Sequence, residues 1–507
     1  MASRLHRPTR LARRACAAFG ISACLLASAA GAQQTAPGDL GLRGDIEPQS
    51  VAAAGGDAAN DASAAPSKPK STARKNALPP LAPYKGAQRL GRRGGPAALP
   101  EGRTPPPAVA ALPAPAPLRR PVRDDRPFDP VGIAVGDLRL TPFVEEDFGW
   151  SSNPGQLPGP QKGSAFLTSE AGFSLNSDWS GSALHGDLKG GVTDYFADPS
   201  ADAPFANGVL DARWGISRDL SLDAEARLAM TTMTAASLGV GPNVAFGPSG
   251  APLTATYGAT LGGDQKFGRL DVAVHGSLDR TAYENATLSD GAVEELSSDD
   301  FNDWGLRARA TYEVSPEFRP FVDALVDARR YDLGEDQYGY ERSSDGVALR
   351  AGADIQVTHV LTGGFDVGYG ERNYQDPRLP NLASPLFDAS LVWTATPLTT
   401  VTLKSVSSLA DTTIRGASGA AQHATTLEID HALRRYLTLA GTVGYVTDAY
   451  VGVPLRDATT TFGLAASYSL NRDVVLKASL SRELYSSNQP GTSYAATIVM
   501  MGLKLQR

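Results

Sequence analysis

The feature that most constrains this 507-residue chain is a two-residue alternation of apolar and polar side chains, which runs from Leu138 to Leu505. Successive side chains of a β-strand point to opposite faces, so the alternation predicts strands with one apolar and one polar face. In 220–232, leucine, alanine and methionine alternate with serine, aspartate, glutamate, arginine and threonine. The pattern recurs in 182–196, 270–278, 347–357, 423–433, 458–470 and 474–484.

About eighteen such segments follow one another, and each has the roughly 9 to 11 or more residues that a tilted membrane-crossing strand needs. Strands of soluble proteins are shorter, about 5 to 6 residues. Apolar spacing of three and four residues, the sign of a helix, does not persist. We therefore expect an all-β fold: an up-and-down antiparallel transmembrane β-barrel of about 18 strands, within a range of roughly 16 to 18.

The connections between these segments show a second regularity. Short turns at 217–219, 266–268, 315–317, 434–436 and 471–473 alternate strictly with longer connections at 151–163, 197–206, 233–252, 284–300, 334–345 and 373–385. Outer-membrane barrels have tight periplasmic turns and longer extracellular loops. The alternation predicts a barrel in the bacterial outer membrane, with its N-terminal leader and its C-terminus in the periplasm.

The first 32 residues are typical of an export signal. Five arginines precede an apolar run from Ala15 to Ala30, and Ala30-Gly31-Ala32 offers a cleavage site. Lipidation of Cys24 is disfavoured, because the apolar run continues past that cysteine. Cys16 and Cys24 are the only cysteines, so cleavage leaves a chain without thiols.

Residues 33–130 are rich in alanine and proline and predict a disordered periplasmic linker. Lys68 to Arg126 holds thirteen lysines and arginines and three acidic residues. This stretch is either a solvated basic tether or an arm that binds anionic envelope polymers. The formal net charge of the whole chain is −7, and the signal and the linker each carry +5, so the barrel segment, 131–507, carries −17. An acidic folded part disfavours a nucleic-acid partner.

The entry to the barrel segment carries a resemblance to a known family. Phe128-Asp129-Pro130-Val131-Gly132-Ile133-Ala134-Val135-Gly136-Asp137 leads into a strand with a central proline, Pro142, and then to Asn153. This segment resembles the start of the putative β-barrel porin 2 family, and Tyr374-Gln375-Asp376-Pro377 is similar to a loop of that family. The resemblance implies an outer-membrane barrel, and some members occur with exopolysaccharide machinery. The chain departs from the usual assembly signal, because it ends in Arg507 rather than in an aromatic residue.

Candidate chemistry is sparse. Five histidines follow the signal, and neither a Gly-x-Ser-x-Gly elbow nor a His-Glu-x-x-His motif accompanies them. We expect no catalytic site, no cofactor and no metal site, since His423 and His431 lie too far apart on one strand to share an ion. Two acidic clusters, 145–147 at the end of the first strand and 294–300 in an outer loop, could hold divalent ions or simply be solvated.

Charged residues on the polar face of several strands are the main candidates for function. A barrel of this size leaves room for an aqueous lumen. The lumen-lining candidates are Asp187, Lys189, Asp211, Arg213, Asp223, Glu225, Arg227, Arg307, Arg309, Asp323, Asp327, Arg350 and Asp354, with Asp271, Arg329 and Asp366 on the same pattern. These charges could bias ion passage or form a salt-bridged plug.

The leading hypothesis is a non-enzymatic, porin-like outer-membrane channel, with exopolysaccharide export as its finer form. The alternative is a structural barrel with a blocked lumen, tethered to envelope polymers by its basic leader. A soluble exported β-sandwich or propeller is a third class, and it does not explain the long strands. The expected partners are outer-membrane lipid, lipopolysaccharide and the barrel assembly machinery.

Overall fold

The computed structural model describes residues 128–507 apart from 160, 178, 234–245, 248–249 and 359. The predicted signal peptide, 1–32, and nearly all of the predicted linker, 33–130, lie outside the described residues. No helix among the described residues is long and apolar enough to cross a membrane.

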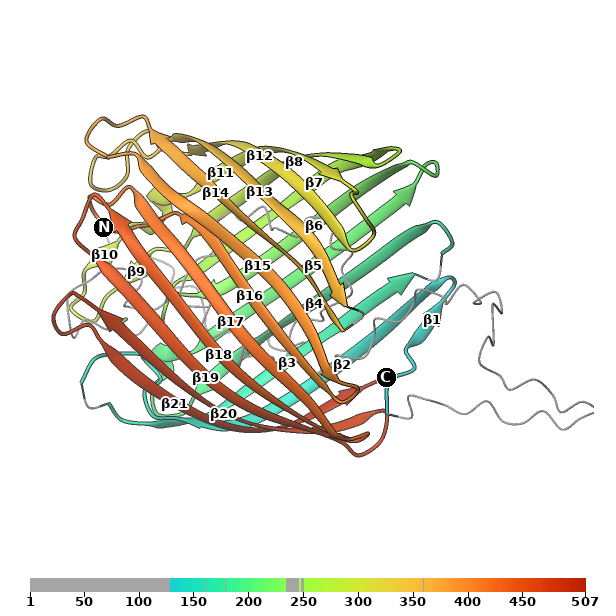
Figure 1. Cartoon of the computed structure of the whole chain (residues 1–507). Helices are drawn as coiled ribbons and strands as arrows, with labels where there is room; N and C mark the ends of the chain where they lie inside the picture. Colours follow the sequence, from blue (N-terminus) through green and yellow to red (C-terminus); the bar gives the residue numbers. More distant parts are fainter. Residues whose placement is uncertain (1–127, 160, 178, 234–245, 248–249, 359) are drawn as a thin grey trace, which may run out of the picture. The chain divides into compact units, whose positions relative to one another are not determined.

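Eighteen long antiparallel strands form one closed sheet, so the expected all-β barrel of about 18 strands is confirmed (Figure 1). The strands are β2 (Leu138–Ser151), β3 (Ser164–Ser177), β4 (Ser182–Tyr195), β5 (Ala203–Gly215), β6 (Leu220–Thr232), β7 (Leu253–Phe267), β8 (Leu270–Tyr283), β11 (Phe301–Tyr312), β12 (Phe318–Tyr331), β13 (Ser344–Thr358), β14 (Leu361–Tyr374), β15 (Leu382–Thr396), β16 (Thr399–Ala410), β17 (Gly419–Arg434), β18 (Leu437–Val451), β19 (Arg456–Ser469), β20 (Val474–Ser487) and β21 (Tyr494–Gln506).

Each of these strands pairs with the next along the chain, which is the up-and-down order. The first and last strands close the cylinder, with pairs from Phe143↔Gln506 to Ser151↔Ile498. Closure leaves no free sheet edge, as a structure that spans lipid requires.

The remaining elements are short. β1 (Ile133–Val135) pairs with the start of β2. The connection between β8 and β11 holds a small hairpin, β9 (Ala286–Thr287) with β10 (Val293–Glu294), and a 3₁₀ turn, η4 (Leu296–Asp299). Another 3₁₀ turn, η2 (Pro199–Ala201), precedes β5.

The alternation in the sequence corresponds to two different surfaces of the wall. Along β11, Trp304 is 49% exposed and Leu306 is 52% exposed, whereas Asp303 and Arg309 on the other face are 3% and 5% exposed. Apolar side chains face outward and charged ones face inward, because the outer face meets hydrocarbon and the inner face offers polar partners.

One expectation about the connections is wrong. Long and short connections do not alternate strictly, because the connection 452–455 at the long-loop end is no longer than the turn 470–473 at the other end. Two turns are also tighter than expected, because Lys266 and Phe267 belong to β7 and Arg434 belongs to β17.

The seam between β15 and β16 lacks backbone pairing over part of its length. Backbone pairing ends at Ala389↔Ser405, so the stretch of β15 that contains Pro385 has no ladder partner in β16. The seam is closed by a side chain instead. The Phe387 N–H donates to Ser407 Oγ at 3.0 Å, and the Ser407 hydroxyl donates to the Phe387 carbonyl at 2.7 Å.

Two inward side chains complete this seam. The Ser407 N–H donates to Asp388 Oδ1 at 2.6 Å, and Arg350 Nη2 donates to the Ser407 carbonyl at 3.2 Å. Arg350 and Asp388 also form an ion pair with each other. Side chains thus satisfy backbone groups that a ladder normally satisfies.

Candidate channel lumen and loop cluster

The inner wall of β11 to β15 is lined by paired arginines and aspartates. Arg307 Nε lies 2.7 Å from Asp323 Oδ2, across the pair of strands β11 and β12. Arg309 Nη2 lies 3.2 Å from Asp354 Oδ1, which is on β13. These contacts reach across and beyond neighbouring strands, so they form a network on the inner face rather than isolated pairs.

The structure places all thirteen lumen-lining candidates on this inner face, and it brings most of them into pairs. Those pairs are Asp187 with His185, Arg213 with Asp223, Arg227 with Glu225, Arg307 with Asp323, Arg309 with Asp354, Asp327 with Arg372, and Arg350 with Asp366 and Asp388. Lys189 and Asp211 lie on the same face of β4 and β5.

Sequence reasoning missed several members of this network. Asp279 forms a 2.5 Å ion pair with Arg227, and the alternation would have included it had the segment been followed past Leu278. Asp303 lies 3.1 Å from Arg329 and follows the β11 alternation as well. Arg342 and Asp411 lie in loops, where no periodic pattern marks an inward side chain.

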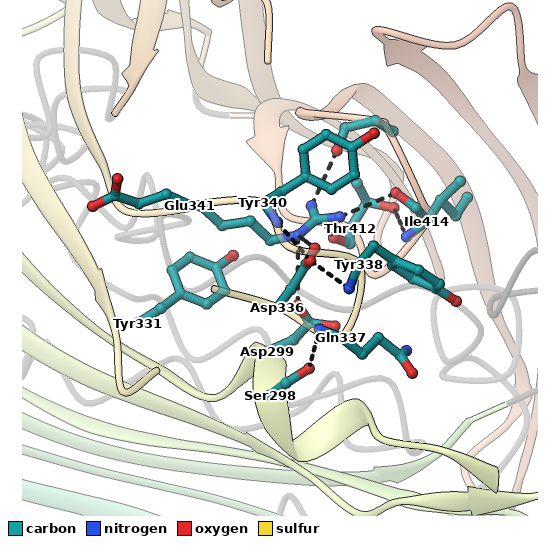
Figure 2. A network of polar contacts seen from close by, with 12 residues as sticks. Ser298, Asp299, Tyr331, Asp336, Gln337, Tyr338, Tyr340, Glu341, Thr412 and Ile414 are labelled. Carbon is teal, nitrogen blue, oxygen red and sulfur yellow. Dashed lines mark hydrogen bonds and ion pairs between the residues drawn. The ribbon is translucent and has the colours of Figure 1, made fainter. Parts of the chain in front are cut away.

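These two loop residues belong to a buried group at the long-loop end of the barrel, which we call the Arg342 cluster: Arg342, Asp336, Asp299 and Asp411, with the backbone carbonyls of Thr412, Ile414 and Ala417. The Arg342 side chain is 1% exposed. Its Nε lies 2.7 Å from Asp336 Oδ2 and 3.5 Å from an Asp299 oxygen (Figure 2).

The two terminal nitrogens of Arg342 hold a third loop. Nη1 donates to the carbonyls of Thr412 at 2.9 Å and Ala417 at 3.0 Å, and Nη2 donates to the Ile414 carbonyl at 3.2 Å. One guanidinium therefore joins the connection 332–343 to the connection 411–418. The planar fork of arginine provides several donors in fixed directions, which suits this role.

Asp411 extends the cluster across the inside of the barrel. It accepts a hydrogen bond from the Tyr331 hydroxyl at 2.6 Å, and Arg329 Nη1 lies 3.3 Å from it. The Tyr283 hydroxyl donates to it at 3.4 Å. Asp411 follows β16, whereas its partners are on β8 and β12, which are not neighbours of β16. The loop that begins at Asp411 therefore turns into the barrel.

A small apolar core includes or contacts the tyrosines that bind Asp411. It consists of Met233, Tyr283, Ala286, Leu288, Leu296 and Phe301, all buried, with Tyr331 packed against it. The Arg329 guanidinium carbon lies 4.6 Å from the centroid of the Phe301 ring. The inward loops are thus packed by side chains of their own as well as joined by ion pairs.

Burial perturbs the acid of this cluster that lies in η4. The pKa of Asp299 is raised to about 8, mainly by burial; the charge of Arg342 lowers it, and the charges of Asp411, Asp336 and Asp300 raise it. Asp299 therefore binds a proton at neutral pH more readily than an exposed aspartate does.

The two expected acidic clusters do not form ion sites as such. Glu145, Glu146 and Asp147 do not end the first strand, which continues to Ser151, and they alternate between its inner and outer faces. In the outer loop, Glu294 accepts a hydrogen bond from the Tyr338 hydroxyl, whereas Asp300 pairs with Arg280. The strand length and the loop fold separate residues that are adjacent in sequence.

The inner wall from β17 through β21 to β3 has a different character, because carboxylates predominate there. Its inward acids are Glu428, Asp430, Asp448, Asp457, Glu483, Glu145, Asp147 and Glu170. Glu145 has a cationic partner, Lys477 Nζ, at 2.9 Å. Glu483 and Asp448 instead accept hydrogen bonds from the neutral groups of Tyr494 and Gln422. Acids therefore outnumber the inward lysines, Lys477 and Lys504, on this part of the wall.

Comparisons with known proteins place the chain in a family. The model of the family described as putative beta-barrel porin 2 matches residues 126–507. No curated protein matches the chain. Among solved structures, the siderophore receptor PirA from Pseudomonas aeruginosa is similar at 10% identity and a TM-score of 0.37, covering 75% of this chain and 81% of its own.

A BenF-like porin from Pseudomonas fluorescens Pf-5 is similar at 12% identity and a TM-score of 0.37, covering 73% of this chain and 99% of its own. Both structural similarities are too remote to bear on function. The family match, in contrast, covers the entire barrel. The chain therefore belongs to the putative beta-barrel porin 2 family and is a β-barrel protein of the bacterial outer membrane.

Proposed function

We propose that this protein is a non-enzymatic outer-membrane channel for small cations and small polar solutes, and that the Arg342 cluster narrows it at the long-loop end. The carboxylate-rich wall from β17 to β3 supports a preference for cations. The Arg–Asp pairs of β11 to β15 make the other part of the lumen polar without a large net charge. The family description, a porin, agrees with this class of function.

The observation that carries the proposal is the position of the loop 411–418. Its first residue, Asp411, contacts side chains of β8 and β12, which are not neighbours of β16. Arg342 holds the loop through three carbonyls. Arg342 provides three of the hydrogen bonds that hold this loop, so its replacement should loosen the constriction. Residues 332–343, 411–418 and the long loops belong on the extracellular side, by analogy with other outer-membrane barrels.

Single-channel recording in planar bilayers tests this proposal. We expect the wild-type protein to show small or infrequent cation-selective openings, and Arg342→Ala to show larger or more frequent ones, because loop 411–418 loses its anchor. Arg456→Ala is the matched control, since Arg456 is an exposed arginine at the same end of the barrel, at the start of β19. It should behave as the wild type does. Anion selectivity in both proteins would contradict the proposal.

The alternative, a structural barrel with a blocked lumen, has one observation in its favour. Arg329 and Arg342 are almost completely buried among ion pairs, as expected of a permanent plug. The same recording separates the two functions, because a scaffold stays silent when Arg342 is replaced. Exopolysaccharide export stays a hypothesis, since the family description names a porin alone.

The proposed partners are lipids and the assembly machinery of the outer membrane. Outward-facing charged pairs lie near the long loops, with Arg280 beside Asp332 at 2.7 Å and Arg330 beside Asp345 at 2.6 Å. Such a rim suits charged head groups, including those of lipopolysaccharide. The basic stretch from Lys68 to Arg126 lies outside the described residues, and binding to anionic envelope polymers through it stays a hypothesis.

A further inference from the structure

Three strands bring one histidine and two aspartates together on the inner wall, away from the Arg342 cluster. Asp223 is on β6, Asp264 on β7 and His275 on β8. One potential ligand atom from each lies within 4.8 Å of the other two. These residues are far apart in sequence, so only the pairing of the strands unites them.

The strand register explains how the imidazole reaches the carboxylates. Asp223 pairs with Gly262, and Gly262 pairs with His275, so the three residues form one row across the sheet. A Cβ atom at Gly262 would lie 2.2 Å from the His275 ring. The ring therefore lies over the backbone of Gly262, in the space between His275 and Asp223, and any larger residue there would displace it.

The carboxylates are incompletely satisfied. The side chain of Asp264 is 7% exposed, and its Oδ2 accepts hydrogen bonds from Arg213 Nη2 at 3.3 Å and Ser221 Oγ at 3.4 Å. Its Oδ1 and Asp223 Oδ2 are both buried and accept no hydrogen bond from an N–H group or a hydroxyl, and the two carboxylates lie within hydrogen-bonding reach of each other. A buried carboxylate oxygen without a donor is costly unless a cation or proton satisfies it.

Arg213 compensates part of this charge. Its Nε lies 3.5 Å from Asp223 Oδ1, but the side chain is 46% exposed and can move away from the wall. The two carboxylates and one guanidinium carry a net charge of −1 before the imidazole is counted. The group therefore has both the ligand atoms and the charge to accept a divalent cation.

We propose that Asp223, Asp264 and His275 bind a divalent first-row transition-metal ion on the inner wall. One imidazole nitrogen and two carboxylate oxygens suit zinc or manganese, whereas calcium prefers ligand sets made of oxygen alone. Water would complete the coordination from the lumen. Arg213 competes with the metal for the same carboxylates. The inference does not depend on whether the lumen conducts.

Zinc binding to the purified, untagged full-length barrel in detergent tests the site, by equilibrium dialysis with elemental analysis. We expect one zinc ion per chain at neutral pH. His275→Ala and Asp264→Asn should each weaken zinc binding by more than about tenfold, the loss typical of replacing a residue that only hydrogen-bonds to a metal ligand. His185→Ala is the control and should bind normally, because its imidazole is on β4, where it pairs with Asp187 at 2.8 Å, and is not part of the group of Asp223, Asp264 and His275.

Arg213→Ala separates a metal site from a simple ion pair. If the guanidinium and the metal compete, this variant binds zinc more tightly than the wild type. Heat-modifiable migration on gels checks that every variant is a folded barrel. The proposal is wrong if neither the folded wild type nor Arg213→Ala binds stoichiometric zinc. It is also wrong if His185→Ala loses as much zinc affinity as His275→Ala does, or if calcium displaces the zinc.

Discussion

At the scale of single residues, the proposed channel depends on charged side chains that are buried with their partners. The Nε of Arg342 donates to Asp336, and its two terminal nitrogens donate to three carbonyls. A side chain with fewer donors could not make all four hydrogen bonds. A lysine could replace the charge but not the fork, because its ammonium is a single point of contact. Removing one partner of such a buried group typically costs about 3 to 5 kcal/mol.

Asp299 gives the cluster a dependence on pH. Its pKa is raised to about 8 in the folded protein from 3.8 in an unfolded chain, so the folded state binds more protons between these values. Stability therefore falls as pH rises through this window, by at most about 1.4 kcal/mol per pH unit. Urea unfolding at pH 5.5 and pH 9 should show the wild type more stable at pH 5.5, with a smaller difference in Asp299→Asn.

The control for this prediction is Asp290→Asn, which changes an exposed carboxylate of the same loop. It should keep the pH dependence of the wild type. The assignment to Asp299 is wrong if Asp299→Asn and Asp290→Asn show the same difference between the two pH values.

At the scale of elements, the main irregularity of the described strands is the seam between β15 and β16, while shorter register shifts occur at the ends of β13 and β17. There Ser407, Asp388 and Arg350 replace backbone hydrogen bonds. Local openings of a protein occur where few backbone bonds protect it. The seam should thus be the part of the wall that opens most readily, next to the loop that Arg342 holds.

Hydrogen exchange measured by mass spectrometry tests the seam. Amides in 382–388 and 406–410 should exchange faster than those of 344–351 at the regular junction of β13 and β14. Ser407→Ala should speed the exchange further and lower the free energy of unfolding by roughly 1 to 3 kcal/mol, because buried backbone groups of Phe387 lose their partner. Equal protection of the two junctions would show that side chains close the seam as firmly as a ladder does.

The elements also show how far the sequence could predict the structure. The alternation located the strands, because one face of each strand meets lipid and the other meets the polar interior of the barrel. β6, for example, has the bounds expected for it, 220–232. It could not provide the partners of each strand residue, so the row of Asp223, Gly262 and His275 was invisible. Nor could it place Asp411 or Arg342, because a loop that folds inward has no periodic signature.

At the scale of the whole molecule, one principle organises the barrel: outward side chains meet lipid and inward ones meet water or one another. β12 provides the sharpest case. Val322, Ala324 and Val326 are exposed on the outer face, whereas Leu325 faces inward beside Arg307 despite being apolar. Position along the strand, and not hydrophobicity, decides which surface a side chain joins.

Spin labels placed one at a time at 322–326, in a chain without Cys16 and Cys24, test this claim most directly. Their accessibility to oxygen, which concentrates in lipid, is compared with that to a water-soluble nickel complex in reconstituted bilayers. We predict high oxygen accessibility at 322, 324 and 326 and low oxygen accessibility at 323 and 325, a two-residue period that includes the leucine. Oxygen accessibility at Leu325 equal to that of its neighbours, or no period at all, would contradict a closed barrel with its apolar face in the membrane.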